Sequence, residues 1–194
     1  MGVPLAGQGR RRRWAGVLAL LLALVPCVTP ASAAGQDGLT QSRIEAVYLY
    51  KFASFVTWPA SAFDSPASPI VVGVYNDPAL VEELRTVAAG KQVNGRPLRV
   101  RALDRDAPAD GLHILFLGKA SNGRAAALLE AVAGGAVLTV SDDPSVHARG
   151  TMVNFVVVDE RVRFDVAMAP VRRSDLRVSA LMLTAARDVA RSAR

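Results

Sequence analysis

Four side chains that could do chemistry lie close together in one short stretch of the sequence. Asp142, Asp143, Ser145 and His147 place two carboxylates, a hydroxyl and an imidazole within six residues. Such groups can build a hydrolase site or hold a metal ion, but only if their side chains converge. No second histidine is nearby, and turn chemistry explains Ser-Asp-Asp-Pro without any site. We therefore expect no catalytic residue, no metal site and no cofactor.

A second group of polar residues predicts a place where a small molecule could bind. Gly118-Lys119-Ala120 lacks the first glycine and the hydroxyl residue of a phosphate-binding loop, so no ATPase of that class is supported. Open α/β sheets bind ligands at the carboxyl ends of their strands. The candidate ligand pocket therefore consists of Gly118, Ser141, Asp142 and Asn154. Asn154 lies within an apolar strand, so its amide either ties the chain to a neighbouring loop or lines this pocket.

The elements that position these residues alternate between strand and helix. Apolar periodicity predicts helices over residues 40–56, 123–133 and 175–189, and Asn76-Asp77-Pro78 is typical of a further helix start. Short apolar or alternating runs predict strands, with a hairpin at the end. These strands cover residues 70–75, 97–103, 113–117, 136–140, 151–158 and 161–167. The pattern predicts a single-domain layered α/β sandwich with a mostly parallel sheet and a C-terminal β-hairpin.

Aromatic residues are concentrated in the first helix. Five of them occur within eleven residues: Tyr48, Tyr50, Phe52, Phe55 and Trp58. They do not all fall on one helical stripe, so the helix is apolar on more than one face. It is either wedged between the sheet and another helix, or it offers a partner-binding surface.

The charge of the chain is concentrated in a leader. The 194 residues carry a formal net charge of +6, which resembles a nucleic-acid-binding protein. However, Arg10–Arg13 precede a twelve-residue apolar stretch, and Ala31-Ser32-Ala33 matches a signal-peptidase site. Cleavage after Ala33 leaves a net charge of +2 and no cysteine, since Cys27 is the only one. We expect a cleaved signal peptide over residues 1–33, a flexible segment over 34–41, and no binding to nucleic acid.

Two other kinds of leader remain open. The arginine block could direct export by the twin-arginine route, and Cys27 lies where a lipoprotein signal has its cysteine. Pro26 fits poorly before a lipidated cysteine. The apolar stretch is also shorter than the roughly 20 residues that span a bilayer. Each of these leaders takes the protein out of the cytoplasm.

Seven short motifs follow one another at residues 46–52, 55–59, 114–118, 137–142, 150–155, 162–166 and 179–183. In this order they resemble the YfiR-like family of periplasmic proteins. The resemblance covers a domain over about residues 42–190. Family members commonly have asparagine where Lys51 stands, and serine and lysine where Ala180 and Leu181 stand. Some have redox-active cysteines, which this domain lacks, so a redox switch is not expected.

The resemblance implies a non-enzymatic regulator in the periplasm. Such a protein binds and represses the periplasmic sensor part of an inner-membrane diguanylate cyclase, and so lowers cyclic di-GMP and affects biofilm regulation. The alternative is a small-ligand-binding accessory protein of a membrane histidine kinase or another sensor. A homodimer and a small-molecule ligand are further expectations. The expected partner surfaces are the aromatic helix, residues 44–58, and the later hairpin.

Overall fold

The computed structural model describes residues 33–119 and 122–190. The chain divides into two compact units, Met1–Ala33 and Ala34–Arg194, and the sheet with its helices belongs to the second. The expected signal peptide, residues 1–33, lies outside the described residues except for Ala33. It therefore remains a prediction.

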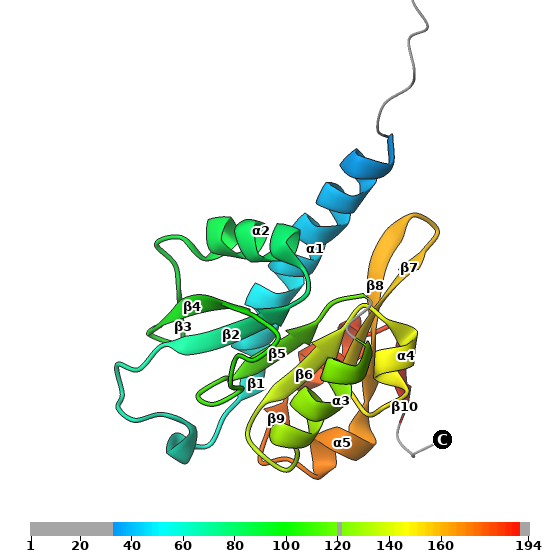
Figure 1. The fold of residues 1–194 in the computed structure, drawn as a ribbon. Coiled ribbons are helices and arrows are strands. Elements are labelled where there is room, and N and C mark those ends of the chain that lie inside the picture. The colour runs from blue at the N-terminus through cyan, green and yellow to red at the C-terminus, as the bar shows by residue number, and fades with distance from the viewer. Residues whose placement is uncertain (1–32, 120–121, 191–194) are drawn as a thin grey trace, which may run out of the picture. The chain divides into compact units, whose positions relative to one another are not determined.

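An eight-stranded mixed sheet forms the centre of this unit (Figure 1). Its strand order is β10-β8-β7-β6-β5-β2-β4-β3, and a separate pair, β1 and β9, is antiparallel. The strands are β1 (Val56–Thr57), β2 (Ile70–Tyr75), β3 (Gln92–Val93), β4 (Arg96–Leu103), β5 (Ile114–Leu117), β6 (Leu138–Ser141), β7 (Val153–Val158), β8 (Arg161–Ala167), β9 (Arg177–Val178) and β10 (Asp188–Ala190). Strands β4, β2, β5, β6 and β7 run parallel, and β7 and β8 form an antiparallel hairpin. The predicted fold class is confirmed.

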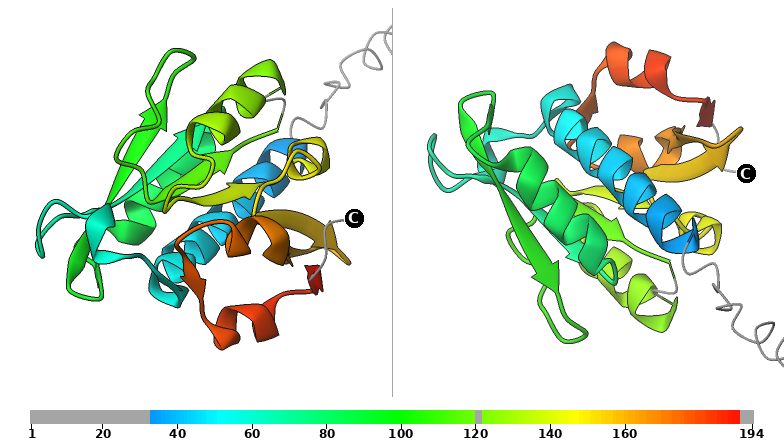
Figure 2. Two further views of the ribbon diagram at one scale, coloured as in Figure 1. Left: turned by 90° about the horizontal axis from the view of Figure 1, so that it is seen from below. Right: turned by 90° about the horizontal axis from the view of Figure 1, so that it is seen from above.

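Helices cover both faces of the sheet. They are α1 (Ala33–Phe55), the 3-10 helix η1 (Ala60–Ala62), α2 (Pro78–Ala88), α3 (Asn122–Ala131), α4 (Pro144–His147), α5 (Met168–Arg172) and α6 (Ala180–Ala185). Helices α1 and α2 lie side by side on one face (Figure 2, right). The alternation of a β-strand divides the core between the faces. Ile114 and Phe116 of β5 pack in the cluster that contains α1 and α2, whereas Leu115 and Leu117 pack in the cluster that contains α3.

Helix α2 begins where the sequence predicts. The Oδ1 of Asp77 accepts a hydrogen bond from the backbone N–H of Leu80 at 2.9 Å, and Pro78 occupies the first turn. An aspartate cap satisfies a helical N–H that would otherwise have no partner, and proline has no N–H to satisfy. The cap therefore fixes the chain direction directly after β2, at the edge of the sheet where the candidate ligand pocket was predicted.

Both ends of the described chain differ from the sequence prediction. Helix α1 begins at Ala33, whereas the sequence predicts a helix from residue 40, and the flexibility expected for residues 34–41 stays a prediction. The single helix predicted over 175–189 is wrong, because that stretch forms β9, the short helix α6 and the edge strand β10. There the backbone N–H of Arg187 donates to the carbonyl of Phe164 at 2.8 Å, and β10 pairs with β8. These sheet hydrogen bonds outweigh a helix propensity that is weak in any single segment.

Candidate functional site

The predicted pocket residues meet at one edge of the sheet. Strand register pairs Leu117 of β5 with Ser141 of β6, and Ser141 with Asn154 of β7. Gly118 and Asp142 follow β5 and β6 directly. The chain passes from β2 to β4 on one side and from β5 to β6 on the other, so the carboxyl ends of β2 and β5 meet at a switch in strand order. Ligands of open α/β sheets bind at such a point.

Gly118 allows β5 to approach the turn after β2. A Cβ atom on Gly118 would lie 2.8 Å from the backbone oxygen of Asn76, which is closer than real contacts allow. The side-chain amide of Asn76 donates in turn to the carbonyl oxygen of Lys119 at 2.6 Å. The glycine is therefore required by the close approach of two backbone segments, which is a structural role.

Ser141 and Asp142 differ in how well their oxygens are satisfied. The hydroxyl of Ser141 donates to the carbonyl of Leu117 at 2.8 Å and accepts from the N–H of Asp143 at 3.0 Å. The Oδ2 of Asp142 lies 3.6 Å from Nζ of Lys119, but its Oδ1 is buried without a hydrogen-bond partner among the described residues. The Oδ1 of Asn154 is likewise buried without a hydrogen-bond partner among the described residues. Buried oxygens of this kind are uncommon in folded proteins.

A second buried carboxyl group, which the sequence pattern alone does not single out, lies near Asp142 at this edge. Glu45 of α1 is only 1% exposed, and the side-chain amide of Gln41 donates to its Oε1 at 2.8 Å. Burial raises the pKa of Glu45 to about 8, with smaller contributions from the charges of Asp142 and Asp77. The signal that could have revealed it is its helical spacing, four residues before Leu49 on the buried stripe.

The same environment affects Asp142. Burial raises the pKa of its carboxyl group to about 6, while the nearby Lys119 ammonium acts in the opposite direction. Desolvation penalises the charged form of a carboxyl group, and an adjacent cation favours it. The sheet edge thus holds two carboxyl groups that retain protons at unusually high pH. Within the described residues, no group of three or more histidine, cysteine or acidic side chains is arranged to hold a metal ion.

The candidate hydrolase residues each have a separate partner. Asp142 faces Lys119, the Oδ1 of Asp143 accepts from the N–H of Ser145 at 2.8 Å, and the Nδ1 of His147 lies 2.8 Å from the Oγ1 of Thr151. Asp143 is the N-cap of α4, so its side chain has a structural task. Among the described side chains, these contacts do not pair the hydroxyl of Ser145 with the imidazole of His147, which contacts the hydroxyl of Thr151 instead.

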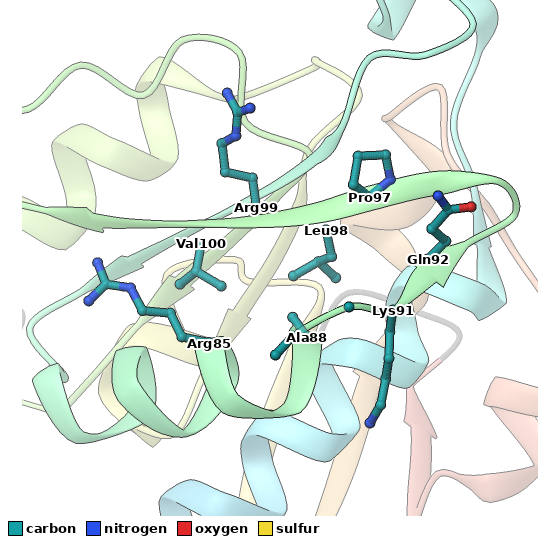
Figure 3. Close-up of a pocket in the computed structure, with 10 residues that line it drawn as sticks. Arg85, Ala88, Lys91, Gln92, Pro97, Leu98, Arg99 and Val100 are labelled. Carbon is teal, nitrogen blue, oxygen red and sulfur yellow. The ribbon is translucent and has the colours of Figure 1, made fainter.

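The four predicted pocket residues do not line any of four hollows on the described surface. One of these hollows, of about 320 Å³, opens beside β2 and β4 and is lined in part by Asn76, Asp77 and Arg105. A second, of about 430 Å³, lies between α2 and β4 (Figure 3). Figure 3 shows that the cationic side chains at this hollow diverge, with Arg99 on the far side of β4 and Lys91 directed away. Ligand binding by the predicted residues stays a prediction.

Two of the five aromatic residues predicted to contact a partner belong to the core. Phe52 and Trp58 are buried, so neither offers a surface to a partner, and for these two the expectation is corrected. The ring of Phe52 lies 4.9 Å from that of Phe164 and 5.8 Å from that of Phe155, measured between centroids. Tyr48, Tyr50 and Phe55 are half-buried and pack against the same core. Their role toward a partner remains a prediction.

Exposed apolar side chains occur instead in the middle of α1 and on the hairpin. Ile44 and Val47 of α1, and Val157 and Val158 of β7, are large hydrophobic residues that remain exposed, Val157 by 55%. We call Ile44, Val47 and Val157 the α1–hairpin patch, since Val158, the next residue of β7, points to the opposite face of the sheet. Ile44 and Val157 share a hollow of about 380 Å³ whose rim includes polar residues of both elements, Gln41 and Glu160 among them. An apolar centre with a polar rim is typical of protein interfaces.

The fold defines a mixed α/β protein with a helix-covered, mostly parallel sheet. Comparison with known proteins then places it: the chain belongs to the YfiR/HmsC-like family, whose model matches residues 42–187. A conserved domain protein from Vibrio cholerae O1 biovar El Tor has a similar crystal structure, with a TM-score of 0.51 and 10% sequence identity. The match covers 76% of this chain and 60% of that one, and at this identity it shows the fold alone.

No curated protein matches the sequence closely enough to add to this comparison. Among the described residues, no helix combines the length and the apolar character needed to cross a membrane. The family match therefore supplies the main evidence on function.

Proposed function

We propose that this protein is a periplasmic, non-enzymatic regulator that binds the periplasmic sensor part of an inner-membrane diguanylate cyclase and represses it. The family match over residues 42–187 carries this proposal. Cyclic di-GMP is made on the cytoplasmic side, so the regulator acts through the membrane protein and does not itself bind the nucleotide.

The mechanism is a shift between two states of the partner. A protein that binds the inactive conformation of a sensor more tightly than the active one stabilises the inactive state. Loss of the regulator then releases the enzyme. The coupling depends only on the difference between the two affinities, so the regulator needs a specific surface and no reactive group.

We propose that the α1–hairpin patch is this surface. Its three apolar residues come from two elements far apart in the sequence, and the fold leaves them exposed. Burying apolar side chains against a partner contributes about 25 cal/mol per Å² of area removed from water. Ile44 and Val157 share one hollow, so we expect them near the centre of the contact, where binding energy is usually concentrated.

The test is crosslinking in intact cells. A photoreactive phenylalanine derivative replaces Val157 and, as a matched control, Leu181, which is a 70% exposed apolar residue on α6. We expect the Val157 position to capture an inner-membrane protein with a cytoplasmic cyclase domain, and the Leu181 position not to capture it. Capture of a histidine kinase would instead support the accessory role, and capture of a second copy would support a homodimer. Equal capture of the cyclase from both positions would contradict the assigned surface.

A further inference from the structure

A hollow of about 490 Å³ lies away from both the sheet edge and the α1–hairpin patch. Its walls come from the end of α3, from β6, from the loop between α4 and β7, and from α5. The buried side chains of Val132 and Met152 form part of its lining. A space of this size falls within the range of pockets that bind small molecules.

The polar groups that could bind a ligand at this hollow are mainly cationic. Arg149, before β7, and Arg173, after α5, both line it and are both exposed. The structure gives neither guanidinium an ion pair or a hydrogen bond with another described residue. Glu130 is the single carboxylate among the lining residues. The opening therefore carries an excess of positive charge.

Several other arginines of the protein have structural partners. Arg187 forms an ion pair with Asp165, Arg96 donates to the carbonyl oxygens of Ser65 and Ser68, and Arg101 donates to those of Pro108 and Asp110. Arg149 and Arg173 have no such task, although they come from different elements and reach the same hollow. Two guanidinium groups beside an apolar floor complement a molecule with an anionic end and an apolar body.

We propose that this hollow binds a small amphipathic carboxylate. Its carboxylate would lie between Arg149 and Arg173, and its apolar body would cover Val132 and Met152. Arginine suits this role because its planar guanidinium can donate two parallel hydrogen bonds to one carboxylate. The site goes beyond the regulatory function proposed above and does not depend on it.

The experiment measures binding by titration calorimetry of the mature protein. The probes are sodium decanoate, below its micelle-forming concentration, and 3-phenylpropionate, with 1-decanol as the uncharged comparison. We expect saturable one-to-one binding of at least one carboxylate and much weaker binding of decanol. Arg149→Gln and Arg173→Gln should each weaken carboxylate binding about tenfold, the loss of one charge-assisted hydrogen bond.

Two further variants make the result specific. Arg161→Gln combined with Arg163→Gln removes two exposed charges from β8, outside the hollow, and should leave binding unchanged. Ala133→Phe adds bulk at an exposed lining position and should abolish binding without changing the thermal unfolding temperature. The proposal is overturned if neither carboxylate binds, if decanol binds as tightly, or if the Arg149 and Arg173 variants bind like the wild type.

Discussion

The indole Nε1 of Trp58 donates a hydrogen bond to the backbone carbonyl oxygen of His113 at 3.2 Å. This bond connects the chain that follows α1 with the start of β5. The imidazole of His113 extends the connection, because its Nδ1 accepts from the N–H of Val71 at 3.1 Å and its Nε2 lies 3.0 Å from the carbonyl oxygen of Ala62. Trp58, the last of the five clustered aromatic residues, therefore helps to hold the fold together.

Trp58→Phe should lower stability without weakening partner binding. The variant loses the indole hydrogen bond and leaves a small cavity, so we expect the free energy of unfolding to fall by about 1–3 kcal/mol. Urea denaturation measures this loss, and titration with the partner's sensor domain measures affinity. A variant that is as stable as the wild type but binds the partner poorly would show that Trp58 lies in the interface after all.

Glu45→Gln should remove a pH dependence of stability. Glu45 has a folded pKa of about 8 against an ordinary value of 4.5, so between these values the folded protein keeps a proton that the unfolded chain has released. Its contribution to stability is fully present below the ordinary pKa and is lost as the pH rises through the folded one. From pH 6.5 to 9 the wild type should lose ~2 kcal/mol more than the variant.

Urea denaturation at several pH values provides this measurement. The range above pH 6.5 limits the contribution of Asp142, whose pKa is about 6. The glutamine keeps a similar volume and can still bond to Gln41. Parallel stability curves for the two proteins would show that Glu45 is already ionised when folded.

Lys119→Met should raise the pKa of Asp142 further above 6. The ammonium group of Lys119 lies 3.6 Å from Oδ2 of Asp142 and opposes the effect of burial. Removing the cation leaves desolvation as the dominant effect. Carboxyl carbon NMR titration reports the value directly. Lys91→Met is the control, since Lys91 lies over the ring of Tyr50 instead. An unchanged or lower pKa in the Lys119 variant would contradict the assigned interaction.

Gly118→Ala should destabilise the protein, whereas Gly123→Ala should not. The new Cβ at position 118 would meet the backbone oxygen of Asn76, which is not free to move away as a flexible side chain could. We expect a loss of about 1–3 kcal/mol in the free energy of unfolding. Gly123, in α3, has open space around it, and alanine there favours the helix. Equal stability of both variants would show that the turn after β2 relaxes easily.

The sequence predicts the centre of this fold better than its edges. The runs 70–75 and 161–167 predict strands with the bounds of β2 and β8. The first run is almost wholly apolar and the second alternates, and these patterns match the burial of the two strands. The C-terminal segment is different. Its short elements depend on the sheet hydrogen bond between Arg187 and Phe164 and on the pairing of β10 with β8, which local propensity does not reveal.

The sequence likewise predicts some residues of the candidate site and not others. Strand order brings Gly118, Ser141, Asp142 and Asn154 to one edge, as the alternation of strand and helix predicts. The helical spacing of Glu45 indicates burial, but its position near Asp142 depends on the tertiary packing of α1 and is not evident from its own segment. A carboxylate in an amphipathic helix is ordinarily expected to face solvent.

We propose that the protein represses a membrane diguanylate cyclase through the α1–hairpin patch. The most direct test measures cellular cyclic di-GMP in a strain that lacks the protein and in strains that express its variants at equal level. We expect cyclic di-GMP to rise on deletion, to return fully to its normal level with the wild type and with Leu181→Asp, and to stay high with Ile44→Asp combined with Val157→Asp. Unchanged cyclic di-GMP on deletion, or full reversal by the double variant, would contradict it.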